Sequence, residues 1–345
     1  MTFLQQEIYD QPAAIRRLLQ AETGTVATVA RAIRDFDPTF VMIAARGTSD
    51  NAARYAQYLM GIKTGLPVAL ATPSVFTLYD AAPTLARALV IGISQSGGSE
   101  DIRRVIEGAR SQGALTLAIT NTPSSPLAET VAYHLYLNAG KEQSVAATKT
   151  YTTELTAIAM LVTALTDQAT DQETLLALPN WVEQTLHMSD PIASWIERYR
   201  YANHIASIGR GYNYCTAFEI SLKIKELCYI TGEEYSEADF RHGPIAIIQP
   251  GFPVIVVAPQ GKPLPLQIDL LKKLKEKAAE CLVISNVDDL AGYAQKMMPL
   301  PDKLPEWISP VCAVIPGQCF AMHLAQAKGH AIDTPEGLQK VTNTV

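Results

Sequence analysis

The sequence ALVIGISQSGGS, residues 88–99, decides the fold of this chain. Its first six residues, 88–93, are apolar or glycine and predict a buried strand, whereas the serines and glycines of 94–99 predict a tight turn. A helical pattern follows over 102–112, and a second apolar strand over 115–119. Strand, turn, helix and strand in this order are the unit from which parallel sheets are built.

The same order occurs upstream of this stretch. Residues 13–36 predict a helix, 40–45 a short apolar strand and 51–60 another helix, and the turn RGTSD (46–50) separates the last two. Short apolar strands that alternate with helices are typical of a sheet covered on both faces. The fold class we predict is therefore α/β, a doubly wound parallel sheet flanked by helices in three layers.

A second copy of the pattern follows later in the chain. Residues 205–211, IASIGRG, repeat the first strand and its Arg-Gly turn. Strands at 254–258 and 282–285, with a helix at 266–279 between them, repeat the rest. The chain therefore contains an internal duplication. Two tandem sheets also fit a length of 345 residues, which is more than a single domain usually has.

Helical patterns at 152–166 and 172–187 lie between the two copies, which places the boundary near 188–196. We therefore predict a first domain at 1–190, which carries the Ser-rich loop, and a second at 191–345.

Composition narrows the class of protein. The chain is 48% hydrophobic, has a net charge of −6 and contains no basic run, which argues against nucleic acid as a partner. The N-terminal sequence MTFLQQE is not a secretion signal, and we expect the apolar runs to fall short of a membrane span, so we expect a cytoplasmic protein with no membrane partner.

The sequence predicts no metal, no disulfide and no cofactor. The six histidines are scattered, and the five cysteines form no CxxC pair and mostly lie in apolar stretches. These cysteines are Cys215, Cys228, Cys281, Cys312 and Cys319.

Two turns place hydroxyl groups where a strand ends and a helix begins. This is where open α/β sheets bind ligands, and helix N-termini favour anions. The alternative is a pair of ordinary N-capped turns. The second copy has APQGKP at 258–263 in place of the Ser-rich loop, so we expect one such site per chain. The candidate phosphate-binding hydroxyls are those of Thr48, Ser49, Ser94, Ser96 and Ser99.

Glu219, Lys223 and Glu226 share one face of a predicted helix, because they are spaced i, i+4 and i+7. A cation beside a carboxylate keeps the carboxylate ionised, which a general base requires. A solvated salt-bridge face explains the same spacing.

His242 lies in the turn FRHGP (240–244), which is unusual for a core residue. An ordinary histidine in a solvent-facing acidic loop is the alternative. Lys340 lies near the C-terminus, where chains often fray.

The motifs together resemble the sugar-isomerase-domain family, most closely the isomerase half of glucosamine-6-phosphate synthase and stand-alone amino-sugar-phosphate deaminases. The resemblance spans nearly the whole chain, and six motifs in the same order carry it. They are Gly47-Thr48-Ser49, Ser94-Gln95-Ser96-Gly97, residues 138–149 (NAGKEQSVAATK), residues 222–226 (LKIKE), His242-Gly243-Pro244 and Lys340.

The resemblance implies a role for each candidate residue. The hydroxyls and Gln95 would hold the phosphate of a sugar, with Val145 and Ala147 lining the sugar site. Glu226 would move a proton between sugar carbons C1 and C2, and His242 would open the ring. Lys340 would close over the substrate, and Lys223 belongs to the same motif as Glu226. Because His242 would serve a neighbouring subunit, the resemblance also implies a homodimer with its site near the interface.

The departures from the synthase pattern favour deamination. Ser99 replaces a usual threonine, Gly98 replaces an acidic residue, and residues 337–342 are more similar to stand-alone deaminases. We expect no glutaminase domain before residue 1. We therefore expect glucosamine 6-phosphate to be converted to fructose 6-phosphate and ammonia. A synthase subunit that receives ammonia from elsewhere, an isomerase for another phosphosugar and a non-catalytic sugar-phosphate sensor remain the alternatives.

Overall fold

A computed structural model of the chain describes residues 1–340, and these form two compact units. We call one the Ser-loop unit; it comprises Gln11–Glu142, Lys149–Pro179 and the tail from Gln339. The other, the α10 unit, comprises Met1–Asp10, Gln143–Thr148 and Asn180–Leu338. Helix α8 (Ala169–Ser189) is divided between the units at Pro179. The boundary at residue 190 that we expect from the sequence stays a prediction.

The Ser-loop unit contains a parallel five-stranded sheet in the order β2-β1-β3-β4-β5. Every residue of β3 is buried, as its apolar sequence predicts. The strands are β1 (Phe40–Ala44), β2 (Val68–Leu70), β3 (Ala88–Ser94), β4 (Leu115–Thr120) and β5 (Tyr133–Tyr136).

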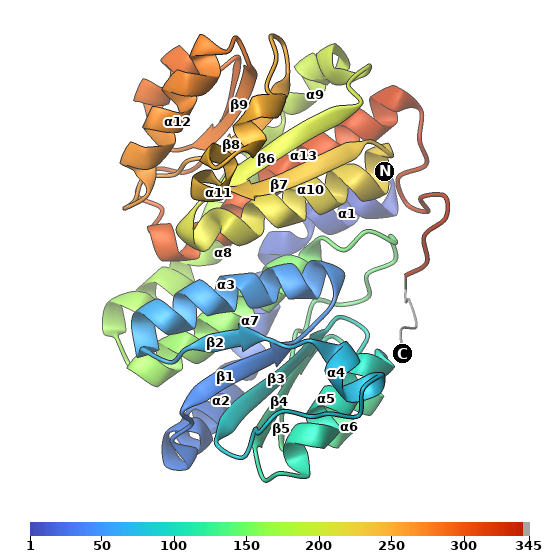
Figure 1. Cartoon of the computed structure of the whole chain (residues 1–345), viewed down its shortest axis with the longest axis vertical. Coiled ribbons are helices and arrows are strands. Elements are labelled where there is room, and N and C mark those ends of the chain that lie inside the picture. Colours follow the sequence, from blue (N-terminus) through green and yellow to red (C-terminus); the bar gives the residue numbers. More distant parts are fainter. Residues whose placement is uncertain (341–345) are drawn as a thin grey trace. The chain divides into compact units, whose positions relative to one another are not determined.

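Helices cover both faces of this sheet (Figure 1). One group comprises α2 (Gln11–Phe36), α3 (Gly47–Thr64) and α7 (Lys149–Thr166), which pack on one another. The other comprises α4 (Pro73–Thr77), α5 (Glu100–Arg110) and α6 (Pro126–Thr130). Buried side chains such as Val90 and Ile106 fill the space between the sheet and α5. The predicted three-layer α/β fold is confirmed in this unit.

The α10 unit repeats the architecture with a second parallel sheet, in the order β10-β9-β8-β6-β7. In both sheets the first strand of the copy pairs with the second on one side and the third on the other, so the predicted duplication is confirmed. The strands are β6 (His204–Gly209), β7 (Thr231–Ser236), β8 (Pro253–Val257), β9 (Glu280–Ser285) and β10 (Lys296–Pro299).

Helices α10 (Tyr214–Cys228) and α13 (Ser309–Lys328) pack against each other in this unit. Gly317 allows their close approach, because a Cβ at this position would lie 2.6 Å from Ile220 Cδ1. Helices α11 (Glu237–Arg241) and α12 (Leu264–Glu276) pack with the sheet around Val256 and Phe240. The remaining short elements are α1 (Phe3–Tyr9), α9 (Ile192–Trp195), η1 (Ile196–Tyr199), η2 (Gly211–Asn213), η3 (Pro244–Ile247), η4 (Asp288–Tyr293) and η5 (Glu306–Ile308).

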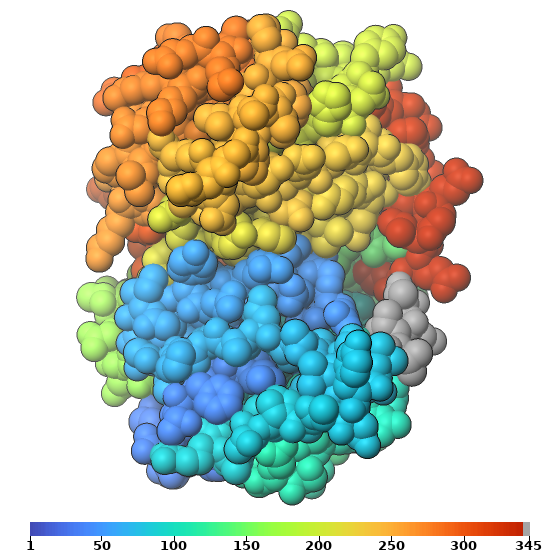
Figure 2. Space-filling model, in the orientation of Figure 1, coloured from blue at the N-terminus to red at the C-terminus, as the bar shows by residue number. Residues whose placement is uncertain are grey.

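One expectation about apolar length was wrong. Residues Glu306–Lys328 are long and apolar enough to cross a membrane by length and composition, and their apolar 18-residue window has a mean hydropathy of 1.4. In the structure 94% of that window is buried, as in the core helix of a folded domain. The segment that follows α13 is mostly exposed, and Figure 2 shows it in red at the surface.

Candidate functional site

The two hydroxyl-bearing turns of the Ser-loop unit lie at its topological switch point. Strands β1 and β3 are neighbours in the sheet, and the chain leaves β1 through α3 to reach β2 on the opposite side. The turns at the carboxyl ends of β1 and β3 therefore flank one crevice, where sheets of this strand order bind ligands. The structure thus brings together the two turns that the sequence analysis selects.

The Ser-rich loop is held in shape by its own hydroxyls. Ser94 Oγ accepts a hydrogen bond of 3.1 Å from the N–H of Gly97, and Ser96 Oγ accepts one of 3.3 Å from Gly98. The Gln95 carbonyl accepts a bond of 3.0 Å from the N–H of Asn121. Gly97 has a φ of 65°, which favours glycine. The loop backbone is therefore ordered before any ligand binds.

Ser99 is the N-cap residue of α5, and its side chain makes no cap hydrogen bond. Ser99 is only partly buried, so its hydroxyl differs from that of an ordinary capping serine, which bonds to the helix N–H groups. The alternative reading as a plain N-capped turn accounts poorly for this geometry.

A cation lies between the two turns, and the sequence analysis assigned it no role. Arg46 is the N-cap residue of α3, and its Nε donates to Asp101 in the first turn of α5 over 2.7 Å. The Asp101 side chain is 1% exposed and the Arg46 side chain 49% exposed. A buried carboxylate thus orients a half-exposed guanidinium at the start of both helices, where anions bind most readily. The only sequence signal was the Arg-Gly turn itself.

Thr48 and Ser49 begin α3 and differ in their surroundings. Ser49 is buried, and its hydroxyl donates to Glu154 Oε1 of α7 over 2.8 Å. Thr48 is partly buried. The Ser49 proton is therefore engaged by a protein acceptor.

The equivalent crevice of the α10 unit contains one of the chain's own carboxylates. Glu306 accepts a hydrogen bond of 2.9 Å from the N–H of Lys262, in the loop that follows β8. A Cβ on Gly211, in the turn after β6, would lie 3.8 Å from Glu306 Oε1. In the second copy, Glu306 therefore lies against both turns that correspond to the hydroxyl-bearing turns of the first copy.

Glu219, Lys223 and Glu226 form a buried cluster on α10. Lys223 Nζ lies 3.3 Å from Glu219 Oε1 and 2.5 Å from Glu226 Oε2. The side chains of Glu219 and Lys223 are 0% exposed, so the alternative of a solvated salt-bridge face is wrong. Burial alone would lower the pKa of the Lys223 ammonium, but the two carboxylates reverse this and hold its pKa above its ordinary value.

Glu226 differs from its partners because its side chain is 23% exposed. Its carboxylate is fixed by the Lys223 ammonium on one side and accessible on the other. A carboxylate held in one orientation beside a permanent cation is suited to accept a proton from a bound molecule.

His242 caps the C-terminal end of α11, where its N–H donates to the Asp239 carbonyl over 3.0 Å. The residue is exposed, and in the part of the chain that the structure describes no hydrogen bond or ion pair joins it to Glu226. Its assigned role in ring opening stays a prediction.

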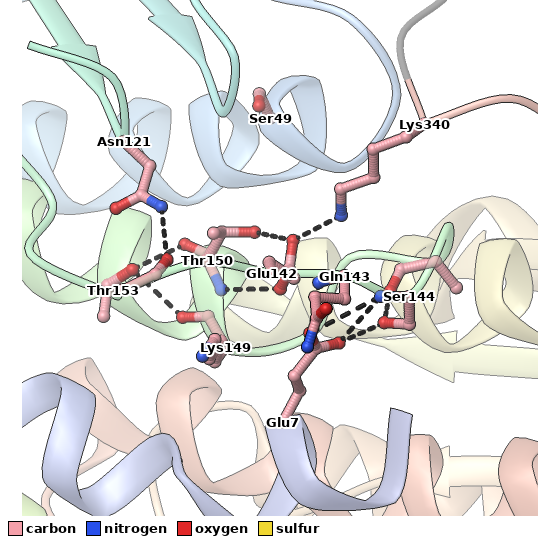
Figure 3. Close-up of polar contacts among 12 residues, drawn as sticks. Glu7, Ser49, Asn121, Glu142, Gln143, Ser144, Lys149, Thr150, Thr153 and Lys340 are labelled. Atoms are coloured by element: carbon pink, nitrogen blue, oxygen red, sulfur yellow. Dashed lines mark hydrogen bonds and ion pairs between the residues drawn. The ribbon is translucent and has the colours of Figure 1, made fainter. Parts of the chain in front are cut away.

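Val145 and Ala147 lie in the segment Gln143–Thr148, which the N-terminal helix α1 holds in place (Figure 3). The buried carboxylate of Glu7 accepts hydrogen bonds from the N–H groups of Gln143 and Ser144 and from the Ser144 hydroxyl. The Val145 N–H donates to the Asp333 carbonyl over 3.0 Å. These hydrogen bonds join residues far apart in the chain, so the sequence does not predict them.

Lys340 is ordered, contrary to the alternative of a frayed end. Its Nζ lies 2.7 Å from Glu142 Oε2, and its side chain is 25% exposed (Figure 3). Val341 and Thr342 of the tail motif lie outside the described residues.

Within residues 1–340, no group of three His, Cys, Asp or Glu side chains could hold a metal ion. All five cysteines are buried free thiols, and burial raises the pKa of Cys228, Cys281, Cys312 and Cys319 to about 12. These thiols have the character of core residues.

Comparison with known proteins identifies a family. The model of the SIS domain matches residues 39–164 and 198–325. The glutamine–fructose-6-phosphate aminotransferase (isomerizing) of Aquifex aeolicus is 33% identical over 344 residues, an alignment that covers 98% of this chain and 57% of the relative. The chain therefore spans a little over half the length of that relative.

Two solved structures extend the comparison. A candidate phosphosugar isomerase from Silicibacter pomeroyi is 32% identical, with a TM-score of 0.85 and coverage of 96% of this chain and 99% of that one. The C-terminal domain of glucosamine-fructose-6-phosphate aminotransferase from Francisella tularensis is 26% identical, with a TM-score of 0.88 and coverage of 97% and 98%. The resemblance drawn from the motifs is confirmed.

We expect Gly97→Ala to abolish binding of fructose 6-phosphate, measured by calorimetry. The φ of 65° disfavours alanine, and the added Cβ would collide with the Ser125 side chain and distort the loop. Gly98→Ala is the matched control, since its Cβ would meet nothing closer than Ser96 Oγ at 3.6 Å and should leave binding intact. Equal affinity of the two variants would contradict the account of the loop.

We expect Lys223→Met to lower the free energy of unfolding by about 3–5 kcal/mol, because Glu219 would remain buried without its cation. Thermal and urea denaturation measure the loss. The double variant Glu219→Gln/Lys223→Met should recover part of it. Lys272→Met, which removes an exposed ion pair with Asp269, should change stability by about 1 kcal/mol or less. If Lys223→Met and Lys272→Met lowered the free energy of unfolding by similar amounts, the buried ion pairs of Lys223 would stabilise the protein no more than a surface pair does, contrary to this account.

Proposed function

Because this chain belongs to the SIS domain family of phosphosugar isomerases, we propose that it moves a proton between C1 and C2 of an amino-sugar phosphate. The substrate we propose is glucosamine 6-phosphate, and the products are fructose 6-phosphate and ammonia.

The buried cluster of α10 is the observation that carries the proposal. Proton abstraction next to a carbonyl needs an ionised base in a fixed orientation. Glu226 meets both needs, since Lys223 holds its carboxylate at 2.5 Å and only 23% of the side chain is exposed. A non-catalytic sensor would not require a carboxylate held in this way.

The phosphate subsite is the second part of the proposal. Ser94, Gln95, Ser96 and Ser99 bind the phosphate, aided by Thr48 and Ser49 of the neighbouring turn. Backbone N–H groups at the start of α5 and the half-exposed Arg46 guanidinium supply positive charge. Val145 and Ala147 line the sugar site.

The proposed reaction runs in three steps. His242 opens the ring by moving the proton between the ring oxygen and the C1 hydroxyl. Glu226 then removes the C2 proton and returns it to C1, while the C1 oxygen takes up a proton and the C2 amine releases one. The aldose with a C2 amine thereby becomes an imine at C2 with a CH₂OH at C1. Water adds to the imine and ammonia leaves, which gives fructose 6-phosphate. Lys340 closes over the bound sugar.

The synthetic direction is a second candidate, favoured by the name of the Aquifex aeolicus relative. Ammonia would add to fructose 6-phosphate, and the same residues would act in reverse order. We prefer deamination because Gly98 and Ser99 depart from the synthase pattern.

We also propose a cytoplasmic homodimer. His242 is exposed on its own unit, as a residue that serves the site of a second subunit would be. The proposal includes no metal or cofactor, since proton transfer and imine hydrolysis need neither.

We expect the protein to release ammonia and fructose 6-phosphate from glucosamine 6-phosphate, in the presence or absence of a chelator. Glu226→Gln should lower kcat by about 10²–10⁴-fold with little change in binding, because the amide cannot take up the C2 proton. Coupled assays for the two products measure this.

Glu276→Gln is the matched control, because it changes an exposed glutamate on α12 and should retain full activity. Turnover by Glu226→Gln at the rate of the control would remove Glu226 from the mechanism. A wild-type protein that binds the sugar phosphate without converting it would instead point to a sensor or another substrate.

A further inference from the structure

Glu142 is a buried carboxylate without a role assigned from the sequence. Its side chain is 0% exposed and contacts Thr150 in the first turn of α7 (Figure 3). Glu142 Oε1 accepts a hydrogen bond of 3.1 Å from the N–H of Thr150, and Oε2 accepts one of 2.7 Å from the Thr150 hydroxyl. These contacts fix the orientation of the carboxylate and place its negative charge at a helix N-terminus, where it is stabilised.

The same oxygen, Oε2, also accepts from Lys340 Nζ over 2.7 Å. Lys340 is 198 residues further along the chain than Glu142, so local sequence cannot place it there. A hydrogen bond between two charged groups at this distance, with the acceptor fully buried, is stronger than an ordinary surface pair. The Lys340 side chain is 25% exposed, so the ion pair does not enclose it completely.

We propose that Glu142 is the positioning residue of Lys340. The ion pair between Glu142 and Lys340, which we call the latch, holds the tail lysine in one place. It orients the ammonium, so that Lys340 contacts the substrate from a fixed position. The action on substrate rests on the proposed function, whereas the latch is a property of the free protein.

The variant Glu142→Gln distinguishes the ion pair with Lys340 from the hydrogen bonds that cap α7. In Glu142→Gln the amide oxygen still accepts from the Thr150 N–H, and the amide nitrogen can donate to the Thr150 hydroxyl. The substitution therefore keeps the shape and the cap of α7, and it removes only the charge that holds Lys340.

The first experiment is hydrogen exchange of the backbone amides of residues 334–340 in the free protein. We expect exchange to become about tenfold faster in both Glu142→Gln and Lys340→Met, and no faster still in the double variant, because each removes the same ion pair. Lys272→Gln is the matched control, which removes an exposed ion pair on α12 and should leave the tail unchanged. Unchanged exchange in Glu142→Gln would overturn the latch.

The second experiment compares kcat and KM for glucosamine 6-phosphate. We expect Glu142→Gln to lower kcat about tenfold or more with a smaller change in KM, and the double variant to match Lys340→Met. Glu142→Asp should restore part of kcat, and the melting temperature of Glu142→Gln should stay close to that of the wild type. A normal kcat in Glu142→Gln, despite a loosened tail, would overturn the positioning role.

The two experiments distinguish a failure of the latch from a failure of the proposed function. If the wild type does not turn over glucosamine 6-phosphate but Glu142→Gln still loosens the tail, the proposed function fails and the latch stands. If the wild type is active but Glu142→Gln matches it in both measurements, the proposed function stands and the latch fails.

Discussion

The α10 unit and its proposed chemistry depend on the ion pairs of the buried Lys223 ammonium. Two carboxylates neutralise it, Glu219 within the core and Glu226 at the edge of it. Removal of Lys223 would leave Glu219 as a buried carboxylate without its cation, so the cluster depends on the ammonium. Its position requires α10 to pack closely on α13, which Gly317 permits. The packing of α10 on α13 therefore also fixes the orientation of Glu226, the proposed base.

The duplication explains why the two units differ in what they offer. Both sheets have the same strand order and hence a crevice at the same place. In the Ser-loop unit, hydroxyls, N–H groups and Arg46 make this crevice suitable for an anion. In the α10 unit, the Glu306 carboxylate accepts a hydrogen bond from the Lys262 N–H in the corresponding loop. The proposed phosphate subsite therefore belongs to the Ser-loop unit, and the buried cluster belongs to the α10 unit.

The sequence predicted the parts of the fold that have a clear period or an apolar run. Strand β3 and helix α5 were predicted almost to their ends, because residues 88–93 are apolar and the helix is strongly amphipathic. Strand β7 was missed because its sequence, TGEEYS, is polar. Helix α13 was missed because it is apolar on all sides, which gives no amphipathic period.

The candidate site was predictable only where chemistry and motif coincide. The Ser-rich loop and Glu226 lie in recognisable motifs, but spacing alone could not tell a buried Lys223 from a solvated one. Burial at that position follows from tertiary packing. Arg46–Asp101 and Lys340–Glu142 join residues 55 and 198 apart, and no periodic pattern links such positions.

The central claim is that Glu226 takes the proton from C2 of an amino-sugar phosphate. Glucosamine 6-phosphate carrying deuterium at C2 tests it most directly, with the fate of the label followed by nuclear magnetic resonance. The account predicts that the wild type moves deuterium from C2 to C1 or to solvent as product forms, and that Glu226→Gln binds the sugar and retains the label. Loss of deuterium from C2 in Glu226→Gln at the wild-type rate would contradict the account.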